Sequence, residues 1–166
     1  MRGTGAWKGS IFTVIAIAAI GFHAYERDPG KKEIEFAAAV AGAAGILYTI
    51  WRTVQLSRQS SAARFAERWN DPTFVERRND VRLVVQGQKT TSEVSSSNIA
   101  AVTNFFEEMS IRIEAREADE AMLKSFFKSA AIQSAVVLKD WIAERQKTQP
   151  TAYREYLKLA ERWKDN

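Results

Sequence analysis

Few residues of this 166-residue chain could carry out chemistry. It contains no cysteine and one histidine, His23. The absence of cysteine excludes Cys–His nucleophiles and thiolate zinc sites, and a Ser–His–Asp system would have no base other than His23. His23 stands at the end of an apolar run, where an interfacial polar side chain is a simpler interpretation than a proton switch or a cofactor ligand. We therefore expect no bound cofactor and no metal site.

The best remaining candidate for acid–base chemistry is a pair of carboxylates, Glu107 and Glu108, within a predicted helix. Glu108 stands four residues before Arg112, a spacing that favours a surface ion pair on a helix. The chain has neither a GxGxxG motif nor a Walker lysine loop for phosphate binding. The sequence therefore predicts a protein that is not an enzyme.

Two uncharged apolar runs dominate the N-terminal third of the chain. They cover residues 9–25 and 36–51, which are 17 and 16 residues long. As helices they would span roughly 24–26 Å, at the short end for a bilayer core of about 30 Å. Snorkelling of Lys8, Glu35 and Arg52 would extend that reach. The sequence predicts a transmembrane hairpin over residues 1–51.

Aromatic residues flank both runs, as expected at membrane–water interfaces. Trp7 and Trp51 would lie at one face of the membrane, with Tyr25 and Phe36 at the other. The connection contains Asp28-Pro29-Gly30, a sequence that stops helices. The residues that we assign to the membrane interface are Trp7, Lys8, Tyr25, Trp51 and Arg52.

Two other interpretations of these runs stay open. Runs of this length also occur as buried helices in the cores of soluble proteins. The first run also resembles the apolar region of a signal peptide, although cleavage after Ala24 would place Phe22 where a small residue is preferred.

The placement of positive charge predicts an orientation in the bacterial inner (cytoplasmic) membrane. Residues 52–70 carry four arginines and one acid, and the N-terminal tail adds two basic side chains, whereas the connection between the runs has three. This distribution favours both termini in the cytoplasm. We expect 52–70 to form a basic helical neck in which Arg58, Arg64 and Arg68 contact lipid headgroups or fix the topology. Residues 83–166 carry twelve basic and twelve acidic residues, which disfavours nucleic-acid binding.

The second apolar run is rich in small residues. Ala38 with Gly42, and Ala41 with Gly45, form small-xxx-small pairs that let a neighbouring helix approach closely. Three partners for this helix fit the pattern: the other helix of the same hairpin only, another integral membrane subunit, or a second copy in a homo-oligomer. All three remain open at this point.

The rest of the chain, residues 71–166, predicts one cytoplasmic helical domain, so the fold class is all-α. Asp71 with Pro72 favours the start of a helix that stops at Gly87, and a polar loop over 88–97 follows. Asp119 is expected to cap a later helix with a break near Ser129, and Thr151 to cap the last one. The expected core or docking anchors are Trp69, Pro72, Phe74, Phe105, Phe106, Phe127, Trp141 and Trp163.

Several of these motifs resemble a known family. They are Trp69-Asn70-Asp71-Pro72-Thr73-Phe74 with Arg77 and Arg78, Phe105-Phe106-Glu107 with Ile111 and Ile113, Phe126-Phe127, Trp141-Ile142 with Arg145, and Tyr153 with Trp163. In this order they resemble the bacterial domain of unknown function 4760 over roughly 65–164. The resemblance implies a helical, membrane-tethered architecture and no particular activity. The glycine-rich turn often found in the family is replaced here by Ala115–Asp119.

Two classes of function fit these expectations. One is a non-catalytic, membrane-anchored accessory or scaffold subunit, which packs against a larger integral membrane complex through its spans and docks through its cytoplasmic domain. The alternative is a self-assembling two-span membrane effector of the antiphage type, whose cytoplasmic domain senses a ligand and whose spans perturb the membrane. Convergent Arg and Lys side chains around a pocket, and toxicity on overproduction, are expected of an effector only.

Overall fold

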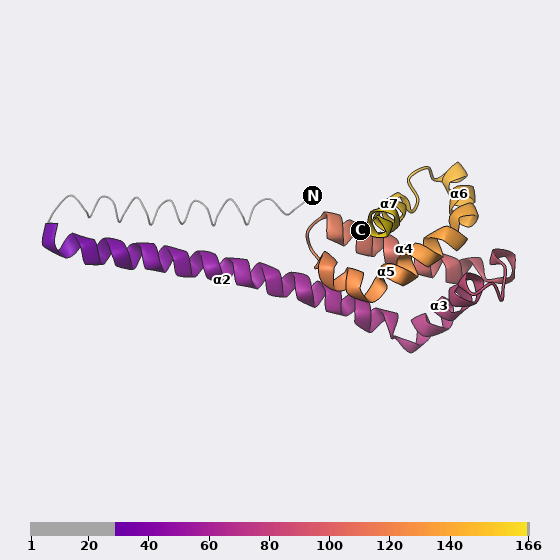
Figure 1. Cartoon of the computed structure of the whole chain (residues 1–166), viewed down its shortest axis with the longest axis horizontal. Coiled ribbons are helices and arrows are strands. Elements are labelled where there is room, and N and C mark those ends of the chain that lie inside the picture. Colours follow the sequence, from indigo (N-terminus) through magenta and orange to yellow (C-terminus); the bar gives the residue numbers. More distant parts are fainter. Residues whose placement is uncertain (1–28, 166) are drawn as a thin grey trace. The chain divides into compact units, whose positions relative to one another are not determined.

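Every regular element in the computed structural model, which describes residues 29–165, is a helix (Figure 1). The fold of this part of the chain is therefore all-α, as the sequence predicts. In chain order the elements are α2 (Pro29–Trp69), α3 (Pro72–Val85), the short 3₁₀ helix η1 (Thr91–Glu93), α4 (Ser96–Glu114), α5 (Glu120–Val137), α6 (Lys139–Thr148) and α7 (Arg154–Lys164).

The second predicted span and the predicted neck form one continuous helix, α2. The chain divides into two compact units, and the boundary falls inside α2 between Val54 and Gln55. The two-helix hairpin is not confirmed, because the first predicted span (9–25) lies outside the described residues, together with Trp7, Lys8, His23 and Tyr25. Within residues 29–165, one helical stretch, Glu35–Trp69, is long and apolar enough to cross a membrane.

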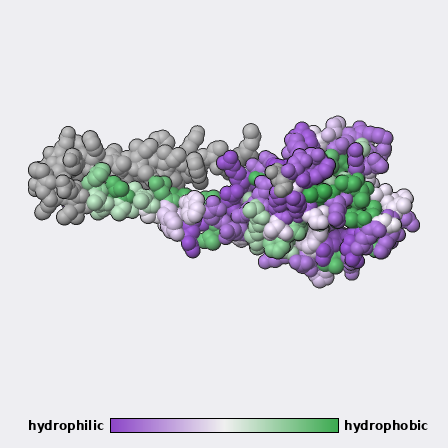
Figure 2. Space-filling view, in the orientation of Figure 1, coloured by the Kyte–Doolittle hydropathy of each residue, from purple (hydrophilic) through white to green (hydrophobic). Residues whose placement is uncertain are grey.

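The α2 portion of the first unit carries apolar side chains on its surface. The relative exposure is 50% for Phe36, 52% for Leu47 and 58% for Trp51. Apolar residues run along this part of the helix and give way to polar ones further on (Figure 2). By itself the helix therefore presents an apolar surface.

The second unit is a helical bundle built around α4. Helix α4 packs against α3 and α7, while α5 packs against α3, α6 and α7. The apolar positions of α4 recur three and four residues apart, so they share a face that the neighbouring helices cover. The buried apolar residues of α4 are Ile99, Val102, Phe105, Phe106, Met109 and Ile113.

An aromatic cluster joins the C-terminal end of α2 to this bundle. The ring of Trp69 lies 5.1 Å from Phe105, 5.4 Å from Phe127 and 5.6 Å from Phe74, measured between ring centroids. Its distance to Phe106 is 5.7 Å. Tilted and edge-on pairs at these separations are favourable beyond the burial of their surface. Trp69 thus links three helices of the second unit to the end of α2.

Two helix starts follow the sequence pattern. The Asp71 carboxylate accepts hydrogen bonds from the backbone N–H groups of Thr73 (2.9 Å) and Phe74 (3.3 Å), and Pro72 occupies the first helical position of α3. The Asp119 carboxylate accepts from the N–H of Met122 at 2.9 Å, which caps α5. Both predicted caps are confirmed, since each carboxylate satisfies N–H groups that have no partner within the helix.

Three local predictions were wrong. Helix α5 continues through Ser129 and ends only near Leu138, because Ser129 leaves the backbone hydrogen bonds intact and its side chain is exposed. Thr151 does not cap the last helix; α7 begins after Tyr153, which adopts a left-handed conformation with φ of 58°. The segment 88–97 is not a plain loop, since it contains η1 and the buried Val94.

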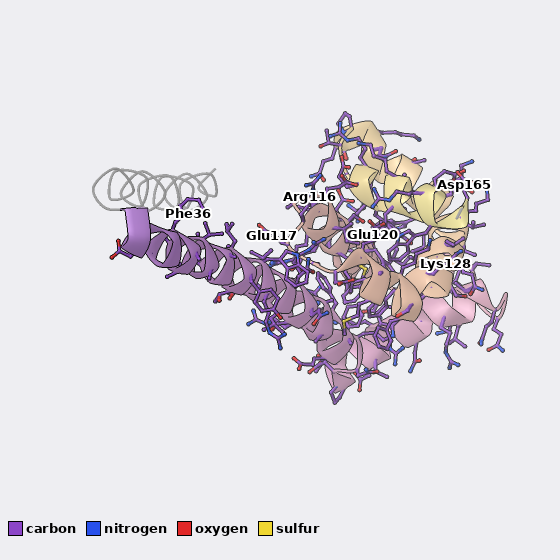
Figure 3. The ribbon with its side chains drawn as sticks, turned by 60° about the vertical axis from the view of Figure 1, so that its left-hand side comes forward. Phe36, Arg116, Glu117, Glu120, Lys128 and Asp165 are labelled. Carbon is purple, nitrogen blue, oxygen red and sulfur yellow. The ribbon has the colours of Figure 1, made fainter. Side chains whose placement is uncertain are left out.

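The ends of α3 and α4 share one hydrogen-bonding arrangement, the Schellman motif. After α3, the N–H of Gly87 bonds to the carbonyl of Val84 and that of Gln88 to Leu83. After α4, the N–H of Arg116 bonds to Ile113 and that of Glu117 to Arg112. Both motifs need a left-handed residue, which is Gly87 (φ 69°) in the first case and Arg116 (φ 58°) in the second. The connection that carries Arg116 and Glu117 leads into Glu120 on the first turn of α5 (Figure 3).

Candidate functional site

A pocket of about 280 Å³ lies within the second unit, among the end of α2 and helices α3, α4 and α5. This volume is just below the range of about 300–1,000 Å³ typical of small-molecule sites. Apolar side chains form much of its wall. Ser134 and four other polar side chains form the rest. The apolar residues are Trp69, Val81, Val85, Val102, Phe106 and Ala130, and the four polar ones are Arg78, Asn79, Arg82 and Gln133.

Arg78 lies against an aromatic ring of the pocket wall. Its guanidinium carbon lies 4.9 Å from the centre of the Trp69 ring, a cation–π contact that fixes the side chain. Its Nε is buried and has no hydrogen-bond acceptor among the described residues. Burial and the neighbouring positive charge of Arg82 lower the pKa of Arg78. Arg78 thus has one buried N–H group that no described protein oxygen accepts.

The pocket has positive charge and no acid in its wall. Arg78 and Arg82 are four residues apart on α3, so both project from the same side of the helix. The acid between them in sequence, Asp80, accepts hydrogen bonds from Lys89 (3.0 Å) and Asn98 (2.7 Å) instead. These hydrogen bonds, that of Lys89 first, lower the pKa of Asp80 and hold its charge at the junction with α4. The two arginines therefore repel each other without compensation from a lining carboxylate.

The wall behind the pocket is rigid. Phe106 stacks on the ring of Tyr156 from α7, with centroids 5.1 Å apart and planes inclined by 15°. The Tyr156 hydroxyl donates to the carbonyl of Ala131 at 2.9 Å and shares a hydrogen bond of 2.7 Å with Ser134. Burial raises the pKa of Tyr156 well above that of an ordinary tyrosine, so its hydroxyl stays protonated. The polar atoms of Ser134 and Tyr156 are thus used for structure.

The neighbouring carboxylates Glu107 and Glu108 bind different partners and do not form a shared acid–base site. Glu107 accepts a hydrogen bond from the backbone N–H of Tyr156 at 2.7 Å, which ties α4 to α7. Glu108 accepts from Arg68 at 2.6 Å and from Arg112 at 3.3 Å. The ion pair expected between Glu108 and Arg112 is therefore confirmed, and each carboxylate has a separate structural partner.

The arginines of the neck lie in different surroundings. Arg68 lies 4.8 Å from the centre of the Phe105 ring and pairs with Glu108, so it is part of the bundle. The backbone carbonyl of Arg58 accepts from the N–H of Asp119 at 3.2 Å, and the Arg58 side chain is half-buried. Arg64 is exposed.

The expected anchors lie in or around the core. Phe74, Phe105, Phe106, Phe127 and Trp163 are buried, while Trp69 and Trp141 are half-buried and packed on the core; Pro72 is exposed at its helix end. The Trp163 indole donates to Glu120 at 2.9 Å and so attaches α7 to the start of α5. Trp141 packs against Tyr153, with ring centroids 5.7 Å apart, and Arg145 lies over its ring.

The membrane-packing candidates lie on α2 in the first unit. Ala38, Ala41, Gly42 and Gly45 are exposed, and no described atom lies within 4 Å of a Cβ added to either glycine. At the end of the apolar stretch, the Tyr48 and Trp51 rings lie 6.0 Å apart, and Arg52 donates to the Tyr48 hydroxyl at 3.4 Å. The expected interface residues Trp51 and Arg52 thus belong to one small cluster with Tyr48.

Sequence reasoning did not identify the pocket. From the sequence, Arg78 was recognised only as part of a family motif, and Arg82 was not assigned any function. A usable signal was the i,i+4 spacing of two arginines on a helix that follows a tryptophan, with valines at 81 and 85. Among residues 29–165, no three His, Cys, Asp or Glu side chains gather in a way that could hold a metal ion.

Comparison with known proteins identifies the family of this chain. No curated protein and no solved structure was found to match the chain. The family model for the domain of unknown function DUF4760 matches residues 36–163. The match begins at Phe36, well before residue 65 where the motifs begin, so it includes the apolar part of α2. Because this region covers more than half of the chain, the protein belongs to the DUF4760 family.

Proposed function

We propose that this protein is a non-catalytic accessory or scaffold subunit anchored in the bacterial inner membrane. The observation that carries the proposal is the exposed apolar surface of α2 between Phe36 and Trp51, a stretch without a charged residue. Exposure of apolar surface to water costs about 25 cal/mol per Å². Insertion of this stretch into a bilayer, or its coverage by other membrane helices, removes that cost.

The polar groups of the same stretch support insertion. The Thr49 hydroxyl donates to the carbonyl of Gly45 and the Thr53 hydroxyl to that of Thr49, each at 2.8 Å. Thr49 lies within the stretch, and its hydroxyl is satisfied inside the helix as an apolar surrounding requires, whereas Thr53 follows Arg52 and lies beyond the stretch. Tyr48, Trp51 and Arg52 at the end of the stretch suit the membrane–water interface.

In this proposal, the partners are membrane lipids and other integral membrane subunits, whereas assembly with further copies of the chain alone belongs to the second candidate function. The face formed by Ala38, Ala41, Gly42 and Gly45 lets another helix approach closely, since the space over both glycines is open in the described structure. The helical bundle then lies in the cytoplasm and docks to the soluble part of the complex, with both termini on that side.

The proposal is tested by isolation of the natively expressed, tagged protein in mild detergent, with mass spectrometry of bound proteins and measurement of the native mass. Resistance of the protein to extraction from membranes at alkaline pH, together with a stoichiometric larger complex, is the expected result. Release into the supernatant at alkaline pH would overturn the membrane anchor. A clean homo-oligomer would overturn the accessory role.

The second candidate is a self-assembling membrane effector that senses a ligand, and the arginine-lined pocket favours it. Arg78 and Arg82 converge on one pocket that has no lining acid, which is the feature expected of such a sensor. Overproduction of an effector should arrest growth, whereas an accessory subunit should be tolerated. If Arg82→Gln relieves growth arrest and Arg77→Gln does not, the pocket controls the effect.

A further inference from the structure

The pocket beside Trp69 combines three features that together specify a ligand. It has a volume of about 280 Å³, apolar walls, and two cationic side chains from one helix. Arg68 and Arg162 of the same unit each have a carboxylate partner, Glu108 and Glu114 respectively. Neither Arg78 nor Arg82 has a carboxylate partner within ion-pair distance among the described residues.

The position of Arg78 shows that its charge is held in place. Its guanidinium lies 4.9 Å from the centre of the Trp69 ring while its Nε is buried without an acceptor. The two terminal nitrogens of Arg78 are not among the buried atoms without a partner and make no described hydrogen bond, so they are the donors that a ligand can reach. Guanidinium groups match the geometry of phosphate and carboxylate oxygens, to which they can donate two parallel hydrogen bonds.

The number of charges favours phosphate over carboxylate. Two guanidinium groups that repel each other are best compensated by a dianion, and a phosphomonoester carries about −1.5 to −2 charges at pH 7. The apolar wall of Trp69, Phe106 and the valines suits a planar organic group, and the amides of Asn79 and Gln133 can donate to or accept from polar atoms on its edge. The volume admits one small molecule.

We propose that this pocket binds a small phosphomonoester with a planar organic part, whose phosphate is held by Arg78 and Arg82. This inference deepens the second candidate function, since it names the class of ligand that such a sensor would detect. The binding test does not depend on membrane perturbation, so failure of either can be recognised separately.

The test is isothermal titration calorimetry of the full chain in mild detergent, with the titration into detergent alone subtracted. The probes are 1-naphthyl phosphate, 1-naphthol and inorganic phosphate. We expect 1-naphthyl phosphate to bind about tenfold more tightly than either of the others, because each of them lacks one half of the recognised group. Absence of measurable binding of 1-naphthyl phosphate, or equal affinity for 1-naphthol, would overturn the proposal.

Matched variants locate the site. Arg82 is exposed and its side chain has no ion pair among the described residues, so Arg82→Gln should fold normally. It should weaken binding of 1-naphthyl phosphate by about tenfold or more, as expected for loss of a charged hydrogen bond. Arg77→Gln removes the same charge from the same helix but does not alter the wall of the pocket. Equal weakening in both variants would mean a general charge effect and would contradict the assigned site.

Arg78→Lys provides a second measure. It keeps the positive charge over Trp69 but removes the planar group with its several donors. We expect binding to weaken by about tenfold, with unchanged helical content by circular dichroism. Undiminished binding in both Arg78→Lys and Arg82→Gln would overturn the proposal.

Discussion

The guanidinium of Arg78 lies over the ring of Trp69, at 4.9 Å from its centre. The same indole also contacts Phe74 of α3, Phe105 and Phe106 of α4 and Phe127 of α5, which belong to the core. One tryptophan therefore forms part of the pocket wall and part of the aromatic core. A ligand that binds the guanidinium of Arg78 would therefore contact a side chain that packs on Trp69, where α2 meets α4 and α5.

Trp69→Ala should lower the free energy of unfolding of the bundle by about 3–4 kcal/mol, because it leaves a cavity among four phenylalanine rings. Trp51→Ala is the matched control, since Trp51 is 58% exposed on α2. Denaturant unfolding of the full chain in mild detergent, followed by circular dichroism, measures both. Similar unfolding midpoints for the two variants would contradict the central position of Trp69.

Arg116→Gly should raise the free energy of unfolding by roughly 1 kcal/mol, because a residue with a side chain is disfavoured at φ of 58°. Gly87→Ala should lower it by a similar amount, since Gly87 occupies the equivalent position after α3 with φ of 69°. Opposite shifts of the thermal midpoint are the expected result. A destabilised Arg116→Gly variant would mean that the arginine side chain has a contact that outweighs its strained backbone.

The ion pair of Arg68 with Glu108 should make stability depend on acid pH. Burial raises the pKa of Glu108, but hydrogen bonds and positive charge from Arg68 and Arg112 outweigh it, so the pKa in the folded state lies below that of an ordinary glutamate. The contribution is therefore present above the pKa of the unfolded state and is lost as the pH falls through the lower pKa of the folded state. Arg68→Gln should flatten this acid dependence of the unfolding free energy. A slope unchanged from that of the parent chain would show that other carboxylates dominate.

Tyr156→Phe should lower the free energy of unfolding by about 1–2 kcal/mol, because the carbonyl of Ala131 and the Ser134 hydroxyl lose a buried partner. Tyr153→Phe serves as control, since the Tyr153 ring is half-buried against Trp141 and its hydroxyl makes no described hydrogen bond. Urea unfolding of both variants measures the two changes in the free energy of unfolding. Equal stability of Tyr156→Phe and the parent chain would argue against a net contribution from the hydroxyl.

Gly42→Leu should disrupt assembly in the membrane without preventing insertion, because the added side chain fills the small-residue face. Val40→Leu is the control: two residues correspond to about 200° around the helix, so it places a leucine, in exchange for valine, on nearly the opposite face. Native gels of membranes solubilised in mild detergent compare the two. Unchanged complex size in Gly42→Leu would exclude this face from assembly.

The sequence alone was sufficient for the all-α class, for the caps at Asp71 and Asp119 and for the family. These features depend on local rules: apolar residues three and four apart share a helix face, and a short carboxylate satisfies free N–H groups at a helix start. The same local rules were insufficient at Tyr153 and Ser129. At Tyr153, the packing of Trp141 against its ring accompanies the start of α7. At Ser129, an exposed serine leaves the helix backbone intact, so α5 continues to Val137.

Only the tertiary structure revealed the candidate site. Trp69, Arg78, Phe106 and Gln133 come from four helices, and no spacing along the chain indicates that they surround one pocket. Tertiary contacts also divided the neighbouring carboxylates, since Glu107 meets the backbone of α7 while Glu108 meets Arg68. Helix periodicity indicates which face of its helix a residue occupies. Which other helix covers that face depends on contacts between segments far apart in the sequence, and the local spacing of residues does not specify these contacts.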